Sequence, residues 1–304
     1  MSERQVAFAV FAAMAAPVAL VSAGMAWPAV LLGASAAALG LTLAAKGPLP
    51  RGLRYAYLLW CVLLMGKVAA MSRACFQDAA GIIPVVLLGL AALGSRQRET
   101  IGRLGALLWP AVAALILGLL AFSVSDFKWA RFAEMRGNMD DWGNVAALCL
   151  SPMVLCSCVK ERKGLQWGGM AGCVLGILVS VICSGVLGNL QGVLHQPLYD
   201  MVRGVSVLGV AERLESLLSV ALCVSFFVAL SLLCSVGVSV VKEEEIRGHE
   251  AWWVALGGLA VSGVINEVPD SIWVGLSVIL GVLVPIICRN RPLEKNRGFF
   301  KNNA

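Results

Sequence analysis

The sequence predicts an all-α integral membrane protein with about ten transmembrane helices, and three observations carry this prediction. Hydrophobic residues make up 59% of the 304 positions, and charged residues only 14%. A soluble domain of this composition would have more apolar surface than its core could bury, and the remainder would face water. The apolar residues also form ten runs between charged clusters, and lysines and arginines are divided unevenly between alternate loops.

Each apolar run approaches the length that a helix needs to cross about 30 Å of hydrocarbon. The first five runs lie at about 5–22, 27–45, 55–72, 79–94 and 104–122. The second five lie at about 142–159, 165–187, 214–241, 251–266 and 271–288. The runs at 79–94 and 251–266 are short for a full crossing. Ten helices leave no room for a separate soluble domain.

The chain is therefore predicted to be a single transmembrane domain over residues 1–304. Its parts are a first half at about 1–122, an outer loop at 123–141, a second half at about 142–288 and a cytoplasmic tail at 289–304. The two terminal segments and one set of alternate loops carry 17 basic residues, and the opposite loops carry six. Because cytoplasmic loops retain lysine and arginine, both termini are predicted to be cytoplasmic.

Other classes of protein find little support in the sequence. The net charge of +6 comes from short loops beside the helices rather than from one basic face, so no nucleic-acid partner is expected. The ten cysteines fall mostly in apolar runs without metal-ligand spacing, so no metal and no cofactor is expected. The motifs of an enzyme are missing, and no catalytic residue is assigned. Cleavage of the first run as a secretory signal is a minor alternative.

Two prolines mark the predicted functional site. Pro17 lies near the middle of the first run and Pro152 near the middle of the sixth. Each proline removes a backbone hydrogen bond, which in a membrane is tolerated where protein or a watery cavity satisfies the freed carbonyl. Runs one and six hold corresponding places in two five-helix halves, which insert with opposite orientations. This pattern is typical of inverted-repeat transporters that bind solute between broken helices.

We therefore predict that helices one and six are broken and bind a small polar solute, with an amino acid as the favoured class. The predicted ligand-binding residues are Ala16, Pro17, Val18, Ser22, Ser151, Pro152 and Met153. The alternative is that both prolines are ordinary kinks, which membrane helices tolerate.

Lys67 is the one basic residue within an apolar run. A lysine at the centre of a bilayer costs about 3 kcal/mol on insertion scales, so its side chain should face the bundle or extend toward the surface. Both snorkelling and a role with solute or protons remain open for Lys67.

Three stretches resemble a known family. The first runs from Gln196 through Pro-Leu-Tyr-Asp-Met-Val to Arg203, followed by Glu212, Arg213, Leu and Glu215 before an apolar helix. The second, Gly102-Arg-Leu to Pro110, opens the fifth run, and the third is Ser2-Glu-Arg-Gln5. Together they resemble the GerAB-type B subunit of spore germinant receptors.

The resemblance implies the fold of the amino acid, polyamine and organocation transporter superfamily, with ten helices in a LeuT-like 5+5 inverted repeat. It implies a nutrient sensor in the inner membrane of a spore, beside A and C receptor subunits. Arg203, Glu212, Arg213 and Glu215 are then expected to pin the outer loop. An amino acid permease that works by alternating access, and a scaffold without a ligand, remain alternatives.

Overall fold

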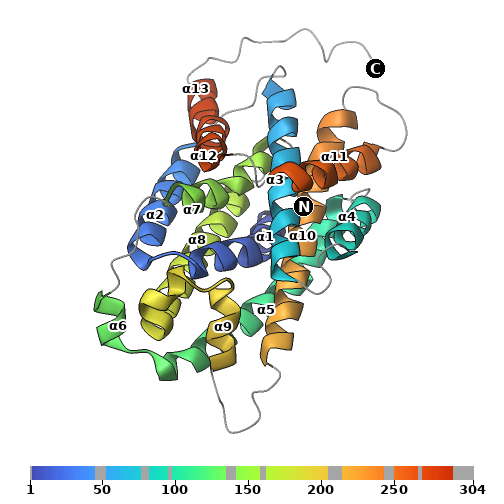
Figure 1. The fold of residues 1–304 in the computed structure, drawn as a ribbon. Helices are drawn as coiled ribbons and strands as arrows, with labels where there is room; N and C mark the ends of the chain where they lie inside the picture. Colours follow the sequence, from blue (N-terminus) through green and yellow to red (C-terminus); the bar gives the residue numbers. More distant parts are fainter. Residues whose placement is uncertain are drawn as a thin grey trace, which may run out of the picture.

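The computed structural model consists of helices packed into one bundle (Figure 1). It describes residues 2–44, 53–76, 82–94, 98–134, 142–157, 162–204, 214–242, 250–265 and 269–289. No strand occurs within these ranges. The short helices α6 and α9 lie at one end of the bundle and α13 lies at the other (Figure 1). We call these the α9 end and the α13 end.

The helices follow the ten apolar runs in order. The first half contains α1 (Glu3–Ala23), α2 (Trp27–Ala44), α3 (Arg54–Cys75), α4 (Ile82–Gly94) and α5 (Arg98–Ser123). The second half begins with α7 (Trp142–Cys149), which is followed by the 3₁₀ helix η4 (Ser151–Ser157) in the same run. It continues with α8 (Arg162–Leu187), α10 (Leu214–Lys242) and α11 (Glu250–Val264). The last run consists of α12 (Asp270–Val278), the π-helical turn η8 (Ile279–Leu283) and α13 (Val284–Arg289). Between the runs lie η3 (Val124–Asp126), α6 (Trp129–Glu134), η5 (Gly188–Gly192) and α9 (Pro197–Gly204).

The predicted all-α membrane architecture is confirmed. Six helices within the described ranges are long and apolar enough to cross a membrane. Four shorter apolar helices, at Trp27–Thr42, Ile82–Leu93, Trp142–Leu155 and Ala251–Val264, occupy the other predicted runs. Two of these four, in the runs at 79–94 and 251–266, were predicted from the sequence to be short.

The sixth helix is broken as predicted. Its α-helical part ends at Cys149, and a 3₁₀ helix begins at Ser151. The amide of Leu150 still donates to Ala146, four residues back, whereas the amide of Met153 donates to Leu150, three residues back. Pro152 lies at this break, and because it has no amide hydrogen it cannot donate to the carbonyl of Leu148 four residues back.

The first helix corrects the prediction, because α1 runs without a break from Glu3 to Ala23 and includes Pro17. A capping box between Ser2 and Gln5 fixes its start. Next to the proline, a side chain from another helix bonds to the backbone of α1. The hydroxyl of Ser225 on α10 accepts from the amide of Ala16 at 2.8 Å and donates to the carbonyl of Ala12 at 2.6 Å.

Neighbouring helices hold α1 in place through very close contacts. Glycines spaced four residues apart on α8, among them Gly164, Gly168 and Gly172, face α1. A Cβ atom on Gly168 would lie 2.5 Å from the carbonyl oxygen of Ala7. Small residues at such spacing let membrane helices approach closely, and van der Waals contact then stabilises the pair.

Gly168→Val is expected to destabilise the bundle by about 1–3 kcal/mol, because the added carbons overlap the backbone of α1. The measurement is thermal unfolding of the purified protein in detergent. Gly118→Val on α5 is the matched control, since a Cβ there meets no atom within 4 Å. Equal melting temperatures for the two variants would contradict this packing.

The predicted outer loop contains more structure than a polar linker. It holds η3 and α6, and the rings of Phe127, Trp129 and Phe132 pack against one another. The ring of Phe132 also stacks on Trp27 at the start of α2. Aromatic contacts therefore anchor this segment to the bundle, and charge patterning alone gave no sign of them.

The described cysteines agree with their interpretation as small apolar residues. None of the seven described cysteines is in a disulfide, and Cys61, Cys149, Cys173, Cys183 and Cys234 are buried within helices. Cys156, Cys158 and Cys288 are not among these seven.

Candidate functional site

A cavity of about 50 Å³ lies where four helices meet. Helix α1 contributes Ala13 and Pro17, and α3 contributes Leu64 and Val68. The broken sixth helix contributes residues on both sides of its break, and α10 closes the remaining wall. The cavity residues of these last two walls are Leu148, Ser151, Pro152, Leu155, Ala229, Leu232 and Leu233.

The cavity contains four of the seven residues that the sequence assigned to the ligand site. Pro17, Val18, Ser151 and Pro152 all line it, although 134 residues separate the two pairs in the chain. The two prolines, one from each half, therefore face the same small space.

The other three assigned residues do not line the cavity. Ala16 and Met153 are fully buried among neighbouring helices. Ser22 is buried against α8, near Gly176, and its hydroxyl has no hydrogen-bond partner within the described part of the chain. These three residues are packed close to the cavity residues in the chain but do not form the cavity wall.

The chemistry of the cavity wall follows from the prolines. Pro17 cannot donate to the carbonyl of Ala13, and Pro152 cannot donate to the carbonyl of Leu148, four residues back in each case. Both Ala13 and Leu148 line the cavity. Among the described lining side chains, only Ser151 has a hydroxyl and none is charged. A polar ligand would therefore depend on backbone groups and on this hydroxyl.

Ser225 is a residue of the site region to which the sequence analysis gave no role. Its hydroxyl bridges the amide of Ala16 and the carbonyl of Ala12, which would pair with each other in an undisturbed helix. The amide at position 16 thus has a partner on α10, and position 17 has no amide hydrogen. A serine within the apolar run of α10 was the available signal, but the sequence does not show which helix it faces.

Ser225→Ala is expected to destabilise the protein by about 1–3 kcal/mol, since the buried polar groups on α1 lose a shared partner. The measurement is thermal unfolding in detergent. Ser235→Ala on the same helix is the control, because that hydroxyl donates to Leu232 in its own helix. If both variants unfold alike, Ser225 does not brace α1.

Lys67 lies outside the cavity wall and extends toward the last helix. Its ammonium nitrogen lies 3.3 Å from a carboxylate oxygen of Asp270. The side chain of Lys67 is 26% exposed, so it keeps some contact with its surroundings.

The structure describes two of the four predicted outer-loop residues. Arg203 on α9 and Glu215 on α10 form an exposed ion pair with a 2.8 Å contact, and the hydrogen bond that Arg203 donates to Glu215 raises the pKa of Arg203. Glu212 and Arg213 lie outside the described residues. Exposed ion pairs contribute about 0–1 kcal/mol.

A second cavity of about 200 Å³ lies at the α9 end. Its wall includes Leu20 of α1, Met71 of α3, and His195 and Tyr199 from the segment at α9. The hydroxyl of Tyr199 lies 3.4 Å from the sulfur of Cys75 and 3.0 Å from the hydroxyl of Ser219. Burial raises the pKa of Tyr199, and the contact with Cys75 adds to this effect. This cavity lies beyond the end of the predicted ligand site.

Comparisons with known proteins identify the fold of the chain. No family model matches the chain, and no curated protein matches it. Among solved structures, the chain is similar to the substrate-bound, outward-open state of a Na⁺-coupled sialic acid symporter. The TM-score is 0.54 at 13% sequence identity, over 93% of this chain and 76% of the symporter chain. The chain is therefore an all-α membrane protein with a transporter fold of the LeuT type.

Proposed function

We propose that the protein binds a small polar solute, most simply an amino acid, in the cavity between α1 and the broken sixth helix. The observation that carries this proposal is that Pro17 and Pro152 line one cavity together with Ala13 and Leu148, the residues four positions back whose carbonyls a proline cannot bond. Carbonyl oxygens and the hydroxyl of Ser151 can accept hydrogen bonds from an ammonium group. The apolar remainder of the wall suits a short aliphatic side chain.

We further propose that binding serves nutrient sensing, as in the B subunit of a spore germinant receptor. The resemblance of residues 196–232 and 102–110 to the GerAB type supports this role. In this proposal the protein lies in the spore inner membrane with both termini cytoplasmic. Solute binding shifts a conformational equilibrium, and A and C subunits respond to the change.

Transport of the solute is the second candidate, and the likeness to a Na⁺-coupled symporter supports it. A permease of this fold exposes its central site alternately to the two sides of the membrane. Receptor and permease share the same site and differ in whether solute crosses the bilayer.

Two measurements on the purified full-length chain test these proposals. Thermal stability is first measured with a panel of amino acids, because a ligand that binds only the folded state raises the melting temperature. Radiolabelled uptake of any stabilising amino acid into proteoliposomes follows, with and without a Na⁺ gradient. Stabilisation without uptake favours the receptor, and stabilisation with uptake favours the permease. If no amino acid stabilises the protein, the proposed ligand class is wrong.

A further inference from the structure

The helices pack mainly as two groups. Helices α1, α2, α7 and α8 pack with one another, and α3, α4, α10 and α11 form the second group. The last span belongs to neither group alone. Its outer segment α12 packs on α7, and its π-helical turn η8 contacts both α2 and α3. This span is therefore in a position to couple the two groups.

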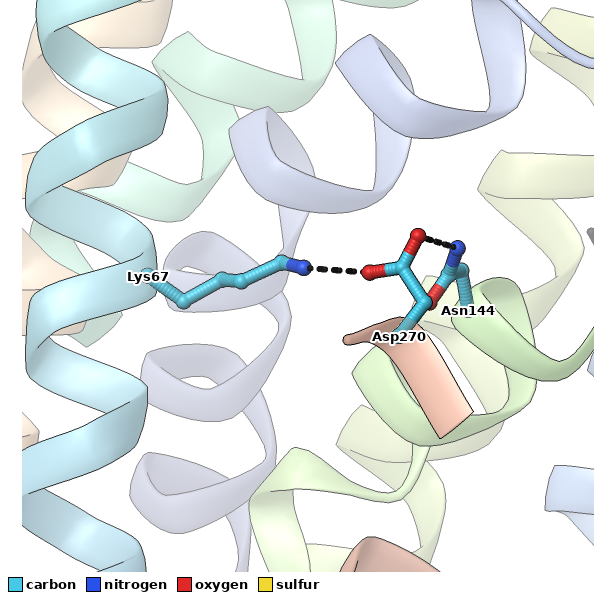
Figure 2. A network of polar contacts seen from close by, with 3 residues as sticks. All are labelled: Lys67, Asn144 and Asp270. Atoms are coloured by element: carbon cyan, nitrogen blue, oxygen red, sulfur yellow. Dashed lines mark hydrogen bonds and ion pairs between the residues drawn. The ribbon is translucent and has the colours of Figure 1, made fainter. Parts of the chain in front are cut away.

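A polar network joins α12 to one helix of each group (Figure 2). Asp270, the first residue of α12, accepts from the amide nitrogen of Asn144 on α7 at 2.9 Å. Its other carboxylate oxygen lies 3.3 Å from the ammonium nitrogen of Lys67 on α3. The same nitrogen lies 5.5 Å from the ring centre of Trp273. One carboxylate thus binds one helix of each group.

The network lies next to the first cavity. Asn144 precedes the cavity residue Leu148 by one helical turn, and Lys67 adjoins the cavity residue Val68. The carboxyl end of α3 meets the segment at α9, where Gln196 donates to the carbonyl of Ala74. Asn144 and Asp270 lie at the starts of α7 and α12, which the charge pattern predicts to be on the outer side, and Lys67 lies between the cavity residues Leu64 and Val68 of α3, level with the cavity.

The bonding of this network suits a contact that opens and closes. The carboxylate of Asp270 is 59% exposed, so water can replace its partners at small cost. Within the π-helical turn, the carbonyl of Leu280 accepts a hydrogen bond from the hydroxyl of Tyr57 on α3. That contact fixes the turn to α3, whereas α12 is held to α3 at Lys67.

We propose that Lys67, Asp270 and Asn144 form a latch that holds α12 against α3 and α7 and restricts access from the α9 end to the first cavity. This proposal depends on the proposed function in one respect, because it assumes that the first cavity is the solute site. Loss of the Lys67 to Asp270 pair releases α12 and shifts the population toward an open outer side.

The test uses Ser151→Cys as a reporter in the cavity of the full-length protein. Intact cells are treated with a membrane-impermeant thiol reagent, and labelling of the parent chain, which has only its native cysteines, is subtracted. Lys67→Met and Asp270→Asn are each expected to raise the labelling rate about two- to five-fold, the range for an exposed ion pair. The exchanged pair, Lys67→Asp with Asp270→Lys, is expected to restore the parent rate.

Two controls separate the latch from general loosening. Glu215→Gln breaks the exposed ion pair with Arg203 at the same end and is expected to leave labelling unchanged. Lys67→Arg keeps the charge and is expected to keep the rate low, even if Lys67→Met accumulates poorly. Unchanged labelling in both single variants, or fast labelling in the exchanged pair, would overturn the latch. Amino acid binding is measured on the same variants, so a latch that works without any binding would count against the proposed function alone.

Discussion

Ala13→Leu is expected to abolish amino acid binding. Ala13 lines the first cavity, which holds only about 50 Å³. Three added carbon atoms would occupy the space between α1 and the sixth helix that the ligand needs. We expect at least a tenfold loss of affinity, equivalent to about 1.4 kcal/mol. The measurement is the ligand-induced rise in melting temperature across a concentration series.

Ala114→Leu is the matched control for this substitution. Ala114 lies on the exposed face of α5, where the added carbons meet lipid. Its affinity should equal that of the parent. Unchanged affinity in Ala13→Leu, with normal protein levels in the membrane, would place the ligand outside this cavity.

The sequence predicted the membrane fold well because hydrophobicity and helix length act locally. It also predicted the break at Pro152, since proline alone removes the amide that an α-helix needs. At Pro17 the same rule failed, because α1 continues through the proline, as α5 continues through Pro110. A proline in an apolar run therefore does not by itself show whether the helix breaks there.

Four of the seven predicted site residues line one cavity and three do not, and the ligand site itself stays a prediction. Pro17 and Ser151 could be assigned to one cavity because their depth in the membrane follows from their place in the run. Ala16 faces a different environment, since its amide binds Ser225, 209 residues along the chain. Bulk at Ala16 would therefore test packing rather than ligand space. Contacts such as these depend on helix rotation, which a uniformly apolar run does not specify.

Pro152→Ala is expected to weaken amino acid binding without preventing insertion of the protein into the membrane. An alanine restores the missing amide, which can then donate to the carbonyl of Leu148 and remove a group from the cavity wall. The seven residues of η4 rise about 2.0 Å each as a 3₁₀ helix and about 1.5 Å each as an α-helix. Full conversion would shorten the span by about 3.5 Å and draw Ser151 away from α1.

The expected loss of affinity for Pro152→Ala is about tenfold, which corresponds to one hydrogen bond to a charged group. Pro110→Ala on α5 is the control, because Pro110 is an exposed proline within a helix remote from the cavity wall. That variant should bind as the parent does. The measurement is the ligand-induced rise in melting temperature of Pro152→Ala and Pro110→Ala across a concentration series. If Pro152→Ala and Pro110→Ala bind alike, the break in the sixth helix serves packing, and the carbonyl of Leu148 plays no part in recognition.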